Sequence, residues 1–259
     1  MRLVSSFLLA FSTLTAIPVP FPKRMPFSEK MLAGSVLFFP LVGLLFGFAG
    51  YGAALAGVAC NAIPLIPVLV MVLWYALNKF LHFDGLCDMF DGFLANRTPT
   101  ERLAIMKDSR VGSFALGGGV LYLLAKYVLL GMTAATVSWA VLAIIPVFGR
   151  YGMVLLAYMG RYPREKGTAK AFIGVIPVLS LVLSTAVCLA VLGGYAFLMH
   201  VPLTVALAMV FTVAAAFLVR AYANARIGGV TGDVLGAMNE LTELAVLLLF
   251  ITAYRFGIS

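Results

Sequence analysis

Residues 82–113, HFDGLCDMFDGFLANRTPTERLAIMKDSRVGS, hold half of the acidic residues of an otherwise strongly apolar chain. The chain has ten Asp and Glu, and five lie here: Asp84, Asp88, Asp91, Glu101 and Asp108. The first three stand at i, i+4 and i+7, so a helix places them on one stripe. Three carboxylates this close repel one another unless a cation lies between them, and oxygen ligands favour Mg²⁺ over zinc. This acidic stretch therefore predicts a magnesium site.

Basic residues follow the carboxylates at once, at Arg97, Arg102, Lys107 and Arg110. Guanidinium and ammonium groups bind phosphate oxygens, and Mg²⁺ commonly binds together with a phosphate-bearing substrate. The order of acids and then bases indicates metal-assisted chemistry on a phosphate.

The composition is that of a membrane protein, since 63% of the residues are hydrophobic and only 11% are charged. We predict an all-α, polytopic membrane helical bundle with about seven spans, in one domain over residues 1–259. Several stretches reach the ~20 apolar residues that a bilayer requires. The spans are expected near 33–57, 62–81, 114–134, 137–159, 172–197, 202–222 and 238–257.

A shorter apolar helix is predicted at the N-terminus, ending before Pro18. At roughly 14 residues it is too short to cross a bilayer, so we expect it to lie in the membrane interface.

The loop charges predict the topology. Charged connections (23–30, 82–113, 161–170 and 226–233) alternate with turns at 58–61, 135–136 and 198–201, which carry no charge beyond His200. All charged loops therefore face one side, which the positive-inside tendency makes cytoplasmic. The same loops explain the net charge of +8 without a nucleic-acid partner. We expect a cytoplasmic (inner) membrane protein whose active site faces the cytoplasm.

Two cations, Lys126 and Arg150, interrupt predicted spans. A charge in lipid is costly, so we expect both to lie at similar depth and to face a wet cavity or an anionic partner. The alternatives are snorkelling to the interface or structural pairing with a buried carboxylate.

The stretch ANARIGGVTGDVLGAMNELTE at residues 223–243 brings clustered glycines and oxygen-bearing side chains to the start of the last span. The glycines allow tight turns and close approach to a ligand. Asp233, Asn239 and Glu240 are candidate site residues, although an N-cap followed by first-turn acids would also explain Asp233 and Glu240. His82, beside Asp84, we interpret as an interfacial, hydrogen-bonded side chain in preference to an acid or base.

Three motifs in order, LTAIPVPFP, HFDGLCDMFDG…IMKDSRVGSF and TGDVLGAMNELTE, resemble the cobalamin synthase family over about residues 7–250. The resemblance implies a multi-pass membrane enzyme that joins adenosylcobinamide-GDP to α-ribazole or its 5′-phosphate. It further implies that GMP is released and that Mg²⁺ is required.

Site roles follow from this resemblance. It implies that Asp84, Asp88, Asp91 and Asp108 belong to the metal-binding signature. Asp108 or Glu240 would take the ribose hydroxyl proton, and the sequence does not choose between them. The residues expected to bind substrate and phosphate are Arg97, Lys107, Arg110, Lys126, Arg150, Thr231, Asp233 and Asn239.

Three other classes of membrane protein share parts of this pattern. The segment Asp88–Arg97 is close to the D-x-x-D-G-x-x-A-R pattern of CDP-alcohol phosphotransferases, but Asn96 intervenes before the arginine. A prenyltransferase of the aromatic-acceptor type would need N-D-x-x-D spacing, which is absent. A cation transporter would carry such acids near the membrane midplane. The sequence leaves open the choice of acceptor and the oligomeric state, including a homo-oligomer.

Overall fold

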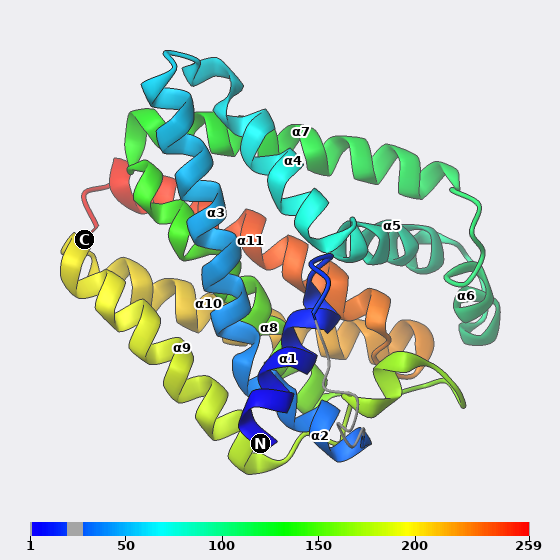
Figure 1. The fold of residues 1–259 in the computed structure, drawn as a ribbon. Coiled ribbons are helices and arrows are strands. Elements are labelled where there is room, and N and C mark those ends of the chain that lie inside the picture. The colour runs from blue at the N-terminus through cyan, green and yellow to red at the C-terminus, as the bar shows by residue number, and fades with distance from the viewer. Residues whose placement is uncertain (1, 20–27, 259) are drawn as a thin grey trace.

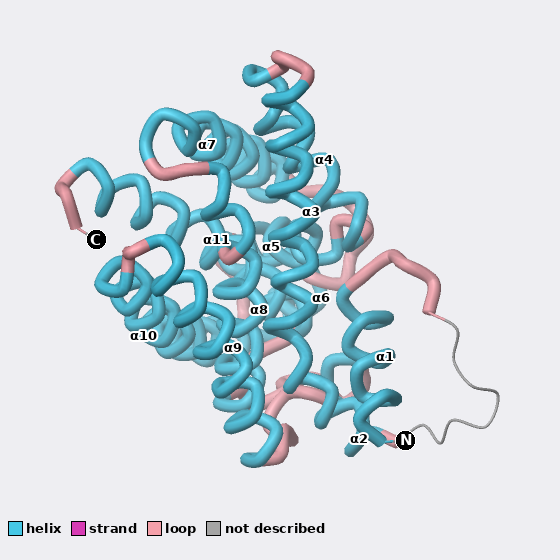
Figure 2. The backbone as a smooth tube through the Cα atoms, turned by 60° about the vertical axis from the view of Figure 1, so that its left-hand side comes forward, coloured by secondary structure: helices cyan, strands magenta, loops and turns pink. Residues whose placement is uncertain are grey.

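The computed structural model describes residues 2–19 and 28–258, so Lys23 and Arg24 lie outside the described residues. Every described element is a helix or a connection between helices (Figures 1 and 2). The elements are α1 (Arg2–Leu14), α2 (Glu29–Gly34), η1 (Ser35–Phe38), α3 (Phe39–Ala59), η2 (Ile63–Leu65), α4 (Ile66–Asn78), α5 (Leu81–Leu94), α6 (Pro99–Ile105), α7 (Ser113–Thr136), η3 (Trp139–Ala143), α8 (Ile145–Met159), η4 (Thr168–Ala171), α9 (Val178–Met199), α10 (Pro202–Ile227) and α11 (Gly232–Arg255).

Six helical stretches in the described part of the chain are long and apolar enough to cross a membrane. A seventh span results if α4 and α5 are counted together, although they are bent by 90°. The prediction of a polytopic membrane helical bundle is confirmed.

The second predicted span, 62–81, is interrupted by this bend. Lys79 and Phe80 both take left-handed backbone conformations, with φ of 52° and 59°. Non-glycine residues rarely adopt this region, and two in succession turn the chain sharply. Helix α5, which carries the three aspartates, therefore leaves at a right angle to α4.

Two other boundaries differ from the predicted spans. Helix α9 begins at Val178 and not near 172, because the 3₁₀ turn η4 and Pro177 precede it. Helix α11 begins at Gly232 and not near 238, because the Thr231 side chain accepts a hydrogen bond from the Val234 amide and caps the helix.

Helices α8 and α11 form the centre of the bundle. In an apolar stretch of 18 residues taken from each span, 89% of the stretch is buried for η3–α8 and 72% for α11. The corresponding shares for α7, α9 and α10 are only 22–28%. The outer helices leave most of their apolar surface uncovered, as expected where they face lipid. Helix α3 approaches α8 and η3 closely, because Gly43 lies against the backbone of Pro146 in α8 and Gly47 against that of Ala143 in η3.

The connections separate into two ends. In Figure 1 the uncharged turns after α3, α7 and α9 lie toward the upper left, and the charged loops near α6 and between α8 and α9 lie toward the right. One cavity joins residues of the charged connections, among them Lys107, Arg164 and Asp233. The alternation predicted from loop charges thus matches the arrangement of the chain.

Four charged side chains are buried together in the bundle. Lys126 on α7 donates hydrogen bonds to Glu240 and Glu243 on α11, each at 2.9 Å from Nζ to the carboxylate oxygen. Arg150 on α8 donates to the other oxygen of Glu243. All four side chains are only 2–3% exposed. The shared partner Glu243 places both cations at the same depth.

Aromatic and polar side chains complete this ion network. Tyr75 and Tyr122 donate their hydroxyl protons to Glu240. The Lys126 ammonium lies 5.0–5.5 Å from the ring centroids of Trp74, Tyr75 and Tyr122, within cation–π range. Asn239 donates to Glu243 at 3.0 Å. These contacts are those of structural pairing with buried carboxylates. Of the two expected surroundings, a wet cavity or an anionic partner, the structure gives both cations the second.

We predict that Lys126→Met destabilises the protein, because it leaves the buried Glu240 and Glu243 with one cation between them. Removing one partner of a buried ion pair costs about 3–5 kcal/mol. The midpoint of thermal unfolding of the purified protein in detergent should therefore fall clearly below that of the parent.

The matched control is Lys126→Met combined with Glu240→Gln, which restores charge balance and keeps the Arg150–Glu243 pair. This double variant should recover most of the lost stability. An unfolding midpoint for Lys126→Met equal to that of the parent would contradict the structural role.

Candidate active site

A cavity of about 550 Å³ lies at the charged end of the bundle, where α1, α3, α5, α8, α11 and the loop after α8 meet. Its volume is within the ~300–1,000 Å³ typical of small-molecule sites. We call it the cleft. The charged residues that line the cleft are Asp84, Lys107, Arg164, Lys166 and Asp233.

Backbone contact between α5 and α11 positions the acidic side of the cleft. A Cβ atom on Gly85 would lie 2.7 Å from the Asp233 carbonyl oxygen, and one on Gly236 would lie 3.0 Å from the His82 Cα atom. Only glycine permits this approach, because any side chain would force the helices apart. The crossing places Asp84 beside Asp233, although 149 positions separate them.

Asp233 is held in place from two sides. Arg164 donates a hydrogen bond to its carboxylate at 3.3 Å, and the Thr231 hydroxyl donates to the same oxygen at 3.1 Å. Arg164 thereby ties the loop after α8 to the first turn of α11. Its Nε atom is buried and has no partner among the described residues.

The three aspartates of α5 have different surroundings. Asp84 is exposed on the cleft. Asp88 is half-buried and within electrostatic range of Asp84, Asp233 and Arg164. Asp91 accepts hydrogen bonds from the backbone amides of Gly112 and Ala115, at 2.7 and 2.8 Å, so it caps the start of α7.

The donor set fits a magnesium ion that arrives with its substrate. Within residues 2–19 and 28–258, no three His, Cys, Asp or Glu side chains converge where they could hold a metal ion. However, Mg²⁺ is usually bound by one or two carboxylates together with substrate phosphates and water. Asp84 and Asp233 on one cavity supply that number of carboxylates, and their chemistry is the oxygen-only set that Mg²⁺ prefers.

Asp108 and Arg110 lie apart from the cleft. They form an exposed ion pair in the connection between α6 and α7, and they line a separate hollow of about 410 Å³ with Asp91. Hydrogen bonds from Arg110 lower the pKa of Asp108 to about 2. The structure therefore does not bring Asp108 together with Asp84.

The remaining basic residues of the acidic stretch also differ in their surroundings. Lys107 lines the cleft, and Arg97 is exposed after α5. Arg102 is buried and donates to the carbonyl oxygens of Gly92 and Phe93 at 3.0 and 2.6 Å, so it closes the end of α5 and is not free for phosphate.

Glu240 and Asn239, like Lys126 and Arg150, lie in the buried ion network and do not line the cleft. Thr231 is the buried N-cap of α11. Sequence reasoning missed Glu243 as the shared partner of both buried cations, although it stands one helical turn after Glu240.

His82 departs from its expected interfacial, hydrogen-bonded state. It is 1% exposed, and both of its ring nitrogens lack a partner among the described residues. It nevertheless lines the cleft. A buried polar group without a partner costs about 1–3 kcal/mol, so its presence requires an explanation at this site.

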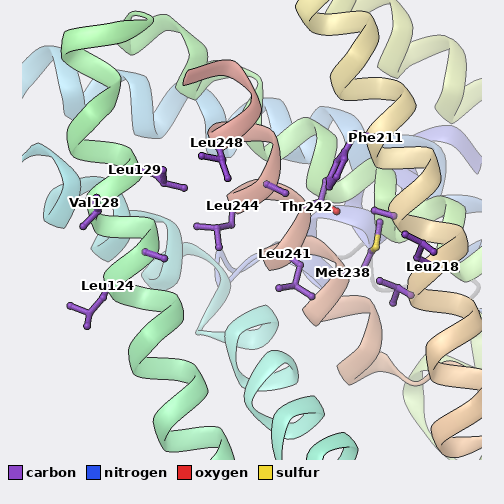
Figure 3. Close-up of a pocket in the computed structure, with 14 residues that line it drawn as sticks. Leu124, Val128, Leu129, Phe211, Leu218, Met238, Leu241, Thr242, Leu244 and Leu248 are labelled. Carbon is purple, nitrogen blue, oxygen red and sulfur yellow. The ribbon is translucent and has the colours of Figure 1, made fainter. Parts of the chain in front are cut away.

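A larger cavity of about 740 Å³ lies between α7, α10 and α11 (Figure 3). Apolar side chains such as Leu124, Phe211 and Leu241 line it, and Thr242 is the one polar residue in the lining. None of the described residues that line it is charged, so it lacks the cations and carboxylates found in the cleft.

Comparison with known proteins supports the family resemblance. The family model described as cobalamin-5-phosphate synthase matches residues 6–251. No solved structure matches the chain.

Three similar proteins bear the same printed name, adenosylcobinamide-GDP ribazoletransferase. One from Fusobacterium nucleatum is 32% identical, over 98% of this chain and 100% of its own. One from Syntrophobacter fumaroxidans is 37% identical (94% and 96%), and one from Pseudomonas paraeruginosa is 38% identical (95% and 97%). A family model that spans nearly the whole chain and full-length relatives above 30% identity place it: the chain belongs to the cobalamin-5-phosphate synthase family.

Proposed function

We propose that the chain is a membrane transferase that joins adenosylcobinamide-GDP to α-ribazole or its 5′-phosphate and releases GMP. The observation that carries this proposal is the cleft, where Asp84 and Asp233 lie beside Lys107, Arg164 and Lys166. Carboxylates with adjacent cations suit a substrate that carries a diphosphate. The names of the full-length relatives supply the identity of the two substrates.

In this reaction a ribose hydroxyl of the acceptor forms a new P–O bond to the phosphorus on the cobinamide side. The P–O bond of the diphosphate bridge breaks, and GMP departs with the bridging oxygen. Lys107, Arg164 and Lys166 hold the phosphate oxygens and offset charge on the departing GMP. Asp84 and Asp233 would hold Mg²⁺, which supplies further neutralisation of the phosphates when bound.

The hydroxyl proton passes to a carboxylate within hydrogen-bond reach. Asp84 and Asp233 line the cleft, whereas Glu240 is enclosed in the ion network and Asp108 lies on another hollow. A role for Asp108 or Glu240 as the base would require that side chain to move into the cleft. The geometry therefore favours a cleft carboxylate.

We predict that the purified protein releases GMP from adenosylcobinamide-GDP and α-ribazole only when Mg²⁺ is present. Asp84→Asn should lower turnover at least ~10²-fold, since removing one metal ligand sacrifices several kcal/mol of charge stabilisation. The unfolding midpoint should stay unchanged, because Asp84 is exposed. If Asp84→Asn turned over at nearly the rate of the parent, Asp84 would not be the proposed Mg²⁺ ligand.

Asp91→Asn is the matched variant on the same helix, and it should behave in the opposite way. It removes one of two carboxylate oxygens that cap α7, which costs about 1 kcal/mol of stability. The unfolding midpoint should fall while Mg²⁺-dependent turnover of the folded fraction is retained. A stable but inactive Asp91→Asn would return this residue to the metal site predicted from the sequence.

We further propose that the cleft faces the cytoplasm of a bacterial inner membrane, as the loop charges predict. The native Cys60 tests this orientation, because it is exposed in the turn after α3, whereas Cys87 is half-buried and Cys188 is buried. A membrane-impermeant maleimide should label Cys60 from outside intact cells.

In a Cys60→Ser background, Glu165→Cys should be labelled only after the cells are permeabilised. This site lies in the charged loop after α8 and is exposed. Labelling of the introduced cysteine in intact cells would reverse the proposed orientation.

A further inference from the structure

The lining of the cleft combines charged residues with a group of buried apolar residues. The charged residues come from α5, from the N-terminus of α11 and from two loops. Six of the apolar residues come from α1, η1, α3 and α8 and from the turn after η4: Leu14, Val36, Phe39, Met153, Ala157 and Phe172. Leu81 on α5, Ala169 in η4 and Leu235 on α11 add to them. A diphosphate accounts for the first group and leaves the second without a ligand.

The apolar group is built around two aromatic rings. The centroids of Phe39 and Phe172 are 6.1 Å apart and the rings are inclined at 53°, a favourable aromatic arrangement. The two side chains are 5% and 6% exposed, so their rings are fixed by packing although they line the cavity. Ser184 on α9 holds the neighbouring backbone by donating to the Val36 carbonyl oxygen at 3.2 Å.

His82 gives the second, independent observation. It lines the same cavity, it is buried, and neither ring nitrogen has a partner among the described residues. Both nitrogens are buried, so a ligand in the cleft that accepts a hydrogen bond would satisfy one of them after the ring turns toward the cavity. The arrangement is thus an apolar, aromatic surface with one unsatisfied polar group.

We propose that this part of the cleft is the acceptor subsite and that it takes the planar base of α-ribazole, an inference that rests on the proposed function. A benzimidazole riboside presents a flat apolar bicycle and one free ring nitrogen, which is an acceptor. Phe39, Phe172 and Leu14 match the bicycle, and the imidazole N–H of His82 matches the acceptor.

The other parts of the two substrates fit this surface poorly. A guanine base carries amide and amino groups that would be left unpaired against Phe39 and Phe172. A corrin ring is far larger than a cavity of about 550 Å³ can enclose. The donor therefore enters with its diphosphate on the charged side, and the acceptor base occupies the aromatic side.

The test measures GMP release by the purified full chain while each substrate is varied separately. Phe172→Ala should raise the KM for α-ribazole about tenfold, the range for a lost apolar contact, and leave the KM for adenosylcobinamide-GDP unchanged. Phe172→Leu keeps most of the side-chain volume and should show a smaller shift in the same direction if the alanine variant does not fold. Phe211→Ala, in the separate apolar cavity of Figure 3, is the control and should change neither KM.

Lys166→Ala removes a cation from the charged side of the cleft and should give the opposite result. It should raise the KM for adenosylcobinamide-GDP and leave the KM for α-ribazole unchanged. The acceptor subsite would be overturned if both Phe172 variants raised the two KM values equally, or if both variants left the two KM values unchanged. Either result would leave the proposed function intact.

Equilibrium binding of α-ribazole without the donor separates the two proposals. If the wild-type protein forms no GMP from the two substrates, the proposed function fails. Binding of α-ribazole that Phe172→Leu weakens would still support the aromatic subsite, and absence of binding to the wild-type protein would overturn it.

Discussion

Charge balance inside an apolar bundle is the constraint on which this structure depends. Two cations and two carboxylates are buried together, and each cation meets a carboxylate oxygen. Because an unpaired charge at this depth is costly, rotation of α11 away from Lys126 or Arg150 is strongly penalised. The ion network therefore fixes the orientation of α11 relative to α7 and α8.

That orientation also determines the cleft. Asp233, Gly236, Glu240 and Glu243 follow one another at intervals of three, four and three residues, so they share one face of α11. Glu240 and Glu243 anchor this face, Gly236 lets α5 cross against it, and Asp233 brings a carboxylate to the cleft. The same face of α11 thus carries the carboxylates of the buried ion network, Glu240 and Glu243, and the cleft carboxylate of Asp233 near its N-terminus.

Hydropathy and loop charge predicted most of the fold, because both depend on local sequence. Apolar runs of sufficient length define the spans, and their charged or uncharged connections define the two ends. The right-angle turn at Lys79 and Phe80 could not be predicted, since neither residue type favours a left-handed backbone.

The sequence indicated which types of side chain form the candidate site, but not which of them contact one another. The spacing of Asp84, Asp88 and Asp91 correctly indicated one helix, yet it carried no information about what lies opposite that helix. Arg164 and Phe172 belong to a loop that offered only charge and apolar character in sequence. Their contacts with Asp233 and Phe39 connect residues 69 and 133 positions apart, which no local pattern encodes.

The acidic stretch shows why a contiguous motif need not be a contiguous site. Asp84 faces the cleft, Asp91 caps α7, and Arg102 closes the end of α5. Asp91 and Arg102 fix the helix that presents Asp84 to the cleft, so loss of activity in a variant of any of the three would look alike in a turnover assay. Their roles separate only when stability is measured beside turnover, since a lost cap lowers the unfolding free energy whereas a lost exposed ligand does not.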